Sequence, residues 1–367
     1  MRPGALALCV LALASCSAPP PAPPAPPAPP APHALTWREV TLPAAGAAVQ
    51  DVAFCGDHWL AVGGLPTGPA AWRSTDGTAW TAVRLAPVSF YGRQSTISTV
   101  ACQGADAVAV GAASGGAHGN PRASTWRSRP DGSWLEYEPA FTQFGGQDSV
   151  GVGAAASTAG PPAAWAIVGN WLGPDGSPGP ALWHSADGAA FTRTLVAPGS
   201  SARATDVAPL PGGGWLVAGE AYGATLTGAS WTSRDGGTTW TPVPVGGPLA
   251  LVTPYGSGTL GVGPAGSWWY DGTAWQKRGG FGDANGWRFL AISAAPAGGA
   301  LSVVTAAAGT TCHLWTTRDG GATWREATMP VSLPVTAQTV AATAVSGDTV
   351  LMATGDGTRA RLWLTTA

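Results

Sequence analysis

Short apolar runs that end at glycine-rich turns recur along most of the chain. Typical examples are residues 59–63 (WLAVG) and 215–219 (WLVAG), each preceded by a second small-apolar run and followed by a segment that contains a tryptophan. Apolar runs of this length, bounded by Gly, Pro, Asn or Asp, are typical of β-strands. The pattern therefore predicts an all-β chain of many short strands.

A tryptophan-centred unit repeats along the chain. Its first tryptophan recurs every 38 to 57 residues, and in most units an Asp-Gly turn and a second aromatic residue follow it. Asp-Gly between two strand-like runs is a strong hairpin signal, because glycine adopts the positive φ that a tight turn requires. With two upstream strands each unit holds four, and a period of this length is typical of β-propellers. The first tryptophans are Trp72, Trp126, Trp183, Trp231, Trp269, Trp315 and Trp363.

The last unit lacks its second aromatic strand, and a matching strand lies at the other end of the domain. Residues 36–43 (TWREVTLP) closely match residues 323–330 (TWREATMP), which follow the Asp-Gly turn of the preceding unit. We therefore predict that the N-terminal strand closes the ring. The predicted fold is a seven-bladed β-propeller of four-stranded blades over residues 34–367, with about 48 residues per blade.

Two targeting signals precede the predicted propeller. Residues 1–15 have one arginine and an apolar run too short to span a bilayer, which is typical of a secretory signal peptide. Leu13-Ala14-Ser15-Cys16 resembles the lipobox of bacterial lipoproteins, and that resemblance implies a lipidated Cys16; a plain signal peptide is the alternative. The segment 16–33 is rich in Pro and Ala and is predicted to be an extended spacer of roughly 40 Å. The expected location is the extracytoplasmic side of the cell envelope.

The hairpin turns resemble the Asp-box (BNR) repeat, S-x-D-x-G-x-T-W. Residues 233–240 match every fixed position and residues 317–324 match with Thr in place of Ser, whereas the other copies are shortened or distorted. The chain thus resembles the Asp-box propellers, which include bacterial sialidases, sortilin-type receptors and photosystem II assembly factors. The resemblance implies that the motif lies on the turn between the third and fourth strands, away from the ligand face, where its residues are structural; a peripheral metal is the alternative. These residues are Ser74, Asp76, Trp80, Asp187, Ser233, Asp235, Gly237, Trp240, Asp319, Gly321 and Trp324.

The residues of sialidase catalysis are not recognisable in the sequence. A sialidase requires an Arg clamp, a Tyr nucleophile paired with Glu, and an Asp acid. The family's R-I-P motif is absent, and none of the tyrosines has a recognisable Glu partner. Asp51 and Asp206 either line the mouth of the central channel or cap loop amides. The sequence thus favours a protein without catalytic activity.

The sequence likewise gives little support for a metal site or a nucleic-acid-binding surface. The histidines are scattered without the short spacings of a zinc site, so no metal or cofactor is expected. Charged residues make up only 10% of the chain and the net charge is −2, which argues against a basic face for nucleic acid.

Loops that combine aromatic residues with amides and charges are the candidate ligand-binding segments. Three of them, residues 90–94, 141–148 and 281–288, join one predicted blade to the next, and two more lie between second and third strands. Flat apolar surface beside amides suits recognition of a peptide or a sugar; the alternative is that these aromatics plug the channel mouth or pack loop on loop. The candidates are Phe90, Tyr91, Arg93, Gln94, Arg122, Phe144, Gln147, Asp148, Trp171, Asp283, Trp287 and Arg288.

Cys55 and Cys102 lie near the same level of the innermost strands of adjacent predicted blades. An oxidising compartment allows a disulfide between them. Their positions are offset by one residue when the two units are aligned, which would turn the side chains to opposite faces, so the pairing stays open. Cys312 is expected to be a buried free thiol.

Taken together, the sequence favours a monomeric, lipid-anchored propeller whose role is binding. The resemblance to assembly factors implies another envelope protein as the partner, and the aromatic loops also allow a glycan. The membrane is reached through the lipid anchor only. A divergent sialidase-like glycoside hydrolase, a lectin and a merely structural lipoprotein are the alternatives.

Overall fold

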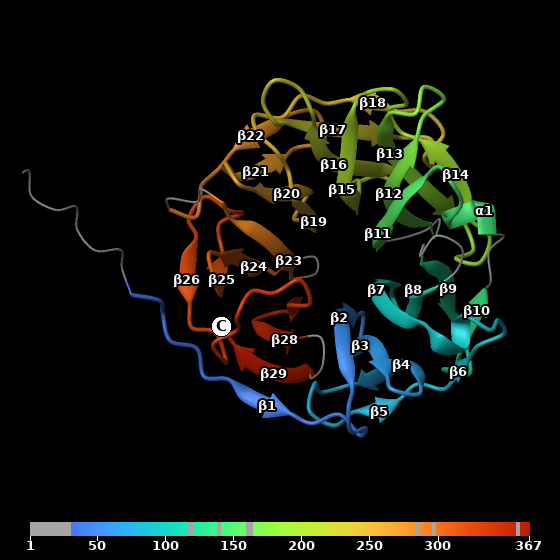
Figure 1. The fold of residues 1–367 in the computed structure, drawn as a ribbon. Helices are drawn as coiled ribbons and strands as arrows, with labels where there is room; N and C mark the ends of the chain where they lie inside the picture. Colours follow the sequence, from blue (N-terminus) through green and yellow to red (C-terminus); the bar gives the residue numbers. More distant parts are fainter. Residues whose placement is uncertain are drawn as a thin grey trace, which may run out of the picture. The chain divides into compact units, whose positions relative to one another are not determined.

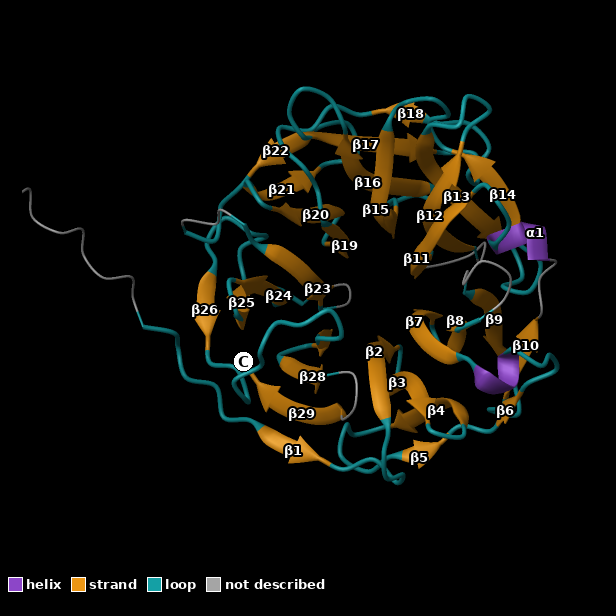
Figure 2. Ribbon diagram, viewed as in Figure 1, coloured by secondary structure: helices purple, strands orange, loops and turns teal. Residues whose placement is uncertain are grey.

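The computed structural model describes residues 31–115, 121–137, 141–158, 164–282, 286–295, 299–356 and 360–367. The predicted signal peptide, Cys16 and Asp283 lie outside these residues. Pro32–Ala367 form one compact unit in which seven sheets are arranged around a central axis (Figures 1 and 2). The prediction of an all-β, seven-bladed propeller with four-stranded blades is confirmed.

Each blade is a meander whose first strand is innermost. Blade 1 comprises β2 (Ala48–Cys55), β3 (His58–Leu65), β4 (Gly68–Ser74) and β5 (Thr81–Ala82). Blade 2 comprises β7 (Thr96–Gln103), β8 (Asp106–Ala113), β9 (Arg122–Ser128) and β10 (Trp134–Tyr137), with the short β6 (Leu85–Ala86) parallel to β10. Blade 3 comprises β11 (Ser149–Ser157), β12 (Trp165–Leu172), β13 (Pro178–Ser185) and β14 (Thr192–Leu195). Blade 4 comprises β15 (Ala202–Pro209), β16 (Trp215–Ala221), β17 (Thr227–Ser233) and β18 (Thr241–Pro242).

The remaining blades repeat the same order, and in the described part of the chain two short helices lie between blades. Blade 5 comprises β19 (Leu251–Tyr255), β20 (Gly258–Gly263), β21 (Gly266–Tyr270) and β22 (Trp275–Lys277). Blade 6 comprises β23 (Arg288–Ala294), β24 (Ser302–Ala308), β25 (Thr311–Thr317) and β26 (Arg325–Ala327). Blade 7 comprises β27 (Val340–Ser346), β28 (Thr349–Gly355), β29 (Ala360–Thr366) and β1 (Arg38–Val40). The helices are the 3-10 helix η1 (Gly92–Gln94) and α1 (Phe141–Phe144). No helix among the described residues is long and apolar enough to cross a bilayer.

The N-terminal strand closes the ring, as predicted. β1 pairs antiparallel with β29, so that Arg38 lies opposite Leu364 and Val40 opposite Leu362 (Figure 1). Arg361 adds a two-pronged ion pair to Glu39, with 2.8 Å between Nε and Oε1. The first and last described strands therefore share one blade.

Tryptophans fill the spaces between the blades. Trp72, Trp126 and Trp183 are at most 1% exposed, and each lies in an apolar cluster that spans two neighbouring blades. Burial of one such ring stabilises the fold by a few kcal/mol. In blade 5 the repeat position Trp269 is only partly buried, and its neighbour Trp268 fills the core instead.

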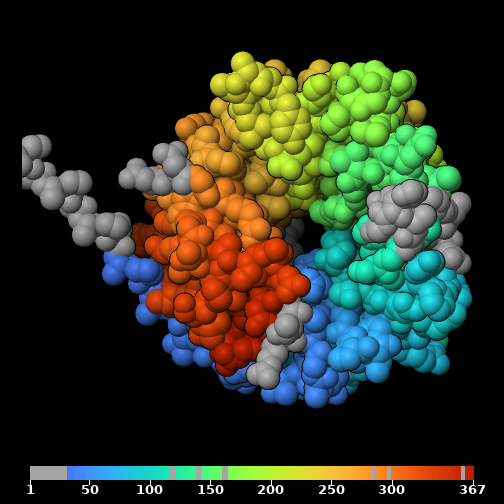
Figure 3. Space-filling model, viewed as in Figure 1, coloured from blue at the N-terminus to red at the C-terminus, as the bar shows by residue number. Residues whose placement is uncertain are grey.

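The connections alternate between two faces of the ring, because each blade is an antiparallel meander. The blade-linking face carries the connections between blades and those between second and third strands. The hairpin face carries the turns between first and second strands and between third and fourth strands. The innermost strands surround the axis, where the surface is hollowed (Figure 3).

The aspartates of the turns between third and fourth strands lie on the hairpin face and satisfy turn amides. Asp76 accepts hydrogen bonds from the amides of Thr78 (2.8 Å) and Ala79 (2.9 Å). Asp235 accepts from the amide and hydroxyl of Thr239. These hydrogen bonds, led by the Ala79 amide and the Thr239 hydroxyl respectively, hold the pKa of both carboxyls well below the usual range. No group of three potential metal ligands is found among the described residues.

A disulfide joins Cys55 of β2 to Cys102 of β7, with the Cα atoms 5.2 Å apart. The one-residue offset does turn the two side chains to opposite faces of their own blades. In the ring, however, one face of blade 1 packs against the opposite face of blade 2, so the offset brings the two sulfurs together. Cys55 accordingly packs in the same apolar cluster as Val100 of blade 2. Cys312 is a buried free thiol, and burial raises the pKa of its thiol group.

Removal of this disulfide should destabilise the propeller substantially. The bridge closes a loop with a sequence separation of 47, which corresponds to about 4 kcal/mol of chain entropy in the unfolded state. We expect the Cys55→Ala/Cys102→Ala variant to unfold at a clearly lower urea concentration than the oxidised wild type. Reductant should lower the wild-type midpoint and leave that of the double variant unchanged. Equal midpoints for both proteins would contradict a stabilising role.

Candidate functional site

The large apolar side chains that remain exposed among the described residues all lie on the blade-linking face. Val88 (55% exposed) and Phe90 (62%) belong to the connection between β6 and β7, and Val150 is the second residue of β11. Tyr222 and Leu226 lie in the connection between β16 and β17. Exposed apolar side chains gathered on one side of a protein are typical of an interaction surface.

The hairpin face has the opposite character. Exposed aspartates lie in its turns at Asp57, Asp76, Asp106, Asp131, Asp187, Asp235, Asp271, Asp319 and Asp348. Their charge keeps this side of the ring hydrated. The two faces therefore differ in chemistry, and the blade-linking face is the better candidate for binding an apolar partner.

A buried carboxylate holds the loop that presents Phe90. Glu136 of β10 is only 1% exposed, and its Oε2 accepts hydrogen bonds from the amides of Val88 (2.7 Å) and Ser89 (2.9 Å). Its Oε1 accepts a hydrogen bond from the Ser89 hydroxyl (2.6 Å). A Cβ atom at Gly92 would lie 1.9 Å from Oε2, so only glycine fits beside the carboxylate. The loop is thus fixed by charge-assisted hydrogen bonds.

Phe90 is flanked by further aromatic and cationic groups. Its ring meets that of Tyr91 edge-on at 5.3 Å, and the Arg122 guanidinium lies 5.5 Å from the centre of the Tyr91 ring. Arg93 is exposed and donates to the main-chain oxygen of Val88 (3.3 Å). We call Val88, Phe90, Tyr91, Arg93 and Arg122 the Phe90 patch. The exposed Gln94 follows at the end of η1.

Two of the predicted ligand-binding aromatics lie in the core. Phe144 and Trp171 are 5% and 7% exposed and both pack against Trp183. The cause is α1, which lies against blade 3: the Trp183 indole donates to the main-chain oxygen of Gln143 (2.7 Å), and the Arg193 guanidinium stacks 3.6 Å from the Trp171 ring centre. These rings are packing residues and offer no surface to a ligand.

The other predicted ligand-binding residues are spread around the ring. Trp287 is partly buried against His313, and the exposed Arg288 donates to the main-chain oxygen of Thr336 (3.3 Å); both belong to blade 6. On blade 3, Gln147 is exposed, and Asp148 accepts the Leu172 amide with its main-chain oxygen. The structure therefore brings Phe90, Tyr91, Arg93 and Arg122 together, with Gln94 next to Arg93, and places Gln147, Asp148, Trp287 and Arg288 on other blades.

Asp51 and Asp206 cap amides at the innermost strands. Each lies at a bulge of its own strand and bridges to the next blade: Asp51 accepts from the amides of Val52 (2.9 Å) and Val100 (3.0 Å), and Asp206 from those of Val207 and Val252 (2.8 Å each). Burial raises the pKa of Asp51 to about 6 and that of Asp206 to about 7. Of the two sequence interpretations, the structure agrees with amide capping.

Comparison with known proteins identifies a fold and no family. No family model and no curated protein matches the sequence. Among solved structures, the chain is similar to a protein of unknown function from Dyadobacter fermentans (TM-score 0.54, 12% identity, 90% of this chain and 97% of that one). It is also similar to a Hadza microbial sialidase (TM-score 0.50, 14% identity, 88% and 66%). A third is the β-propeller domain of the Trilobed protease from Pyrococcus furiosus, which has an open velcro topology (TM-score 0.50, 10% identity, 88% and 94%).

At these identities the similarity establishes the fold alone. The chain spans 66% of the length of the sialidase, so that enzyme is longer than the shared propeller. The present ring is closed by β1 and β29, in contrast to the open topology of the protease domain. The fold class is thus a β-propeller that occurs in hydrolases and in proteins of unknown function.

Proposed function

We propose that this protein is a non-catalytic binding module that recognises a protein partner through the Phe90 patch. The observation that carries the proposal is Phe90 itself, 62% exposed on a loop that the buried Glu136 holds in place. An aromatic residue on a loop whose main chain is already fixed loses less conformational entropy on binding, so more of its contact energy contributes to affinity.

The composition of the patch supports a protein partner. Aromatic and arginine side chains are enriched among the residues that dominate protein interfaces. The Phe90 patch combines both, with the Tyr91 ring between Phe90 and Arg122.

We propose further that the protein works at the cell envelope as a lipoprotein. The support is the lipobox-like Leu13-Ala14-Ser15-Cys16 and the Pro-rich spacer that follows it. Lipidation of Cys16 would hold the propeller at a membrane surface, at a distance that the length of the spacer allows. Mass spectrometry of the mature N-terminus tests this part separately.

Crosslinking and affinity capture of the tagged, membrane-anchored protein tests the binding proposal. We expect wild type to capture one stoichiometric partner, and the Phe90→Ala/Tyr91→Ala variant to capture at least about tenfold less of it. The matched control is Tyr222→Ala/Leu226→Ala, which removes exposed apolar surface from blade 4 on the same face and should capture as wild type does.

The thermal unfolding midpoint of each variant shows whether it is folded. A folded Phe90 variant that retains the partner, or a wild type with no partner, would contradict the proposal. Glycan arrays and glycosidase assays would then test the lectin and hydrolase alternatives.

A further inference from the structure

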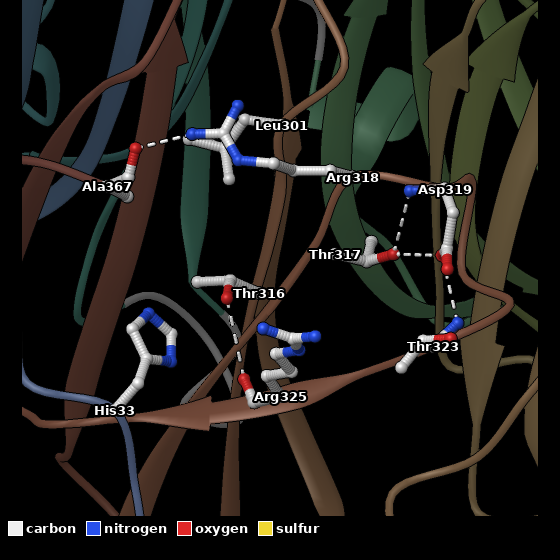
Figure 4. Close-up of a pocket in the computed structure, with 9 residues that line it drawn as sticks. All are labelled: His33, Leu301, Thr316, Thr317, Arg318, Asp319, Thr323, Arg325 and Ala367. Carbon is white, nitrogen blue, oxygen red and sulfur yellow. Dashed lines mark hydrogen bonds between the residues drawn. The ribbon is translucent and has the colours of Figure 1, made fainter.

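A pocket of about 440 Å³ lies on the hairpin face, at the joint between blades 6 and 7. Its walls come from the β25–β26 turn, from Leu301 before β24, from the end of β29 and from the segment that leads into β1. Figure 4 shows basic side chains on several sides of this space. The lining residues are His33, Leu301, Thr316, Thr317, Arg318, Asp319, Thr323, Arg325 and Ala367.

Most charges around the pocket are already paired. Arg318 binds Asp348 (2.7 Å) and the main-chain oxygen of Ala367. The carboxylate of Asp319 accepts from the Thr317 hydroxyl (2.7 Å) and the Thr323 amide (2.9 Å), so it is committed to its own turn. These groups form fixed walls and leave few free donors.

Arg325 is the exception. It is the first residue of β26, it is exposed, and no carboxylate pairs with it among the residues that the structure describes. Its side chain points into the pocket beside Thr316, whose hydroxyl makes only a long contact of 3.5 Å to the Arg325 main-chain oxygen (Figure 4). A guanidinium and a hydroxyl are thus both available to a ligand.

His33 lies on another side of the pocket. Its amide and its Nδ1 both contact the main-chain oxygen of Glu326, at 2.9 and 3.0 Å. Because a carbonyl oxygen can only accept, Nδ1 is the donor and the ring orientation is fixed. Nε2 remains for the pocket, toward which the ring points in Figure 4. It can accept a hydrogen bond from a P–OH group.

We propose that this pocket binds a phosphate group carried by a small polar body of the glycerol phosphate type. Arg325 supplies charge and a two-pronged donor, and Thr316 and His33 approach from other directions. A tetrahedral group with several oxygens meets donors from separate elements better than a planar carboxylate does. The volume exceeds that of phosphate alone and leaves room for the attached body. The phosphate belongs either to a free metabolite or to a lipid headgroup. A headgroup is included because His33 is the last residue of the predicted spacer, which follows the predicted lipid-carrying Cys16.

Calorimetric titration of the full chain in detergent micelles tests the pocket in two arms. One arm adds glycerol 3-phosphate, with glycerol as the negative control, and the other adds short-chain phosphatidylglycerol at equal phosphate concentration. Binding in the first arm supports a free phosphate ester, and binding in the second alone supports a headgroup. No binding in either arm at ligand concentrations up to about 10 mM would overturn the proposal.

Variants separate this pocket from general electrostatic attraction. We expect Arg325→Ala to weaken binding by about tenfold or more, and His33→Gln to weaken it less. The matched control is Arg129→Ala, which removes an exposed arginine from another turn of the same face and should change affinity less than about twofold. Equal affinities of Arg325→Ala and wild type would also overturn the proposal. The Phe90 patch lies on the other face, so failure here would not affect the proposed protein partner.

Discussion

Deletion of residues 31–42 should destabilise the propeller more than any single substitution proposed above. The segment includes β1, and it buries Val40 (8% exposed) against blade 7 and packs Leu35 and Trp37 against Leu301 and Val345. The loss of these contacts and of the ladder to β29 corresponds to about 5 kcal/mol, which lowers the unfolding temperature by about 7 °C for a domain of this size.

The deletion should also change the state of association. β29 would become an unprotected edge strand, and exposed edges pair with other chains. Circular dichroism on heating and size-exclusion chromatography measure the two effects. The control removes residues 17–29 of the spacer and should leave both unchanged. A peptide of residues 31–46 added in trans should restore part of the lost stability; a deletion variant that stays monomeric with the wild-type midpoint would show that β1 is dispensable.

Local signals explain why the architecture could be predicted. An Asp-Gly turn between two aromatic strands sets a hairpin within ten residues of chain, and the repeat of that signal sets the number of blades. The match between residues 36–43 and 323–330 predicted which strand closes the ring, and β1 does occupy the place in blade 7 that β26 occupies in blade 6. None of these inferences requires knowledge of how one blade faces the next.

The disulfide depended on that missing knowledge. The register of β2 and β7 could be aligned from the sequence, and the alignment placed Cys55 and Cys102 on opposite faces of their blades. Only the stacking of blades in a ring makes opposite faces adjacent, which is a property of tertiary structure. The same alignment thus points to a bridge once the ring is known.

Loop aromatics were the least predictable residues, because composition does not say whether a loop turns outward or inward. Phe90 and Phe144 lie in similar sequence contexts, yet one is 62% and the other 5% exposed. Partners far away in the sequence decide the difference. Arg193 of β14 donates to the main-chain oxygens of Thr142 (3.0 Å) and Gln143 (3.1 Å) and so holds α1 against blade 3.

Glu136 was missed although the sequence held a signal for it. In the strand that begins at Trp134, Glu136 shares a face with the buried tryptophan, because side chains alternate. A carboxylate on an inward face requires several donors, and the amides of Val88 and Ser89 supply them. An acidic residue at an inward strand position therefore indicates an ordered loop nearby.

The stability of the propeller should fall as the pH rises from about 4.5 to about 7.5. Burial raises the pKa of Asp206 from 3.8 to about 7, and the charge of Asp51 also raises it. An aspartate in the unfolded chain loses its proton near pH 4, so the native state binds more protons across this window. The free energy of unfolding then decreases with pH, for Asp206 by up to about 4 kcal/mol.

The turn carboxylates act in a different pH range. Hydrogen bonds from turn groups lower the pKa of Asp76 and Asp235, so their contribution is present above about pH 4 and is lost only as the pH falls further. The two groups of aspartates therefore have opposite effects in separate windows. Stability should be greatest near pH 4 to 5, where the turn aspartates are ionised and Asp206 is still protonated.

Urea unfolding of wild type and Asp206→Asn across this pH range separates the contributions. Asparagine does not titrate, but it can accept only one of the two amides of Val207 and Val252, so the variant should be less stable at low pH. Its decline in stability between pH 4.5 and 7.5 should nevertheless be markedly shallower than that of wild type. Asp76→Asn is the matched control and should keep the wild-type slope in this window. The test is the slope of the free energy of unfolding against pH, and not its absolute value. If the stability of wild type is constant or rises with pH in this window, Asp206 is ionised in the fold at no cost and the prediction is wrong.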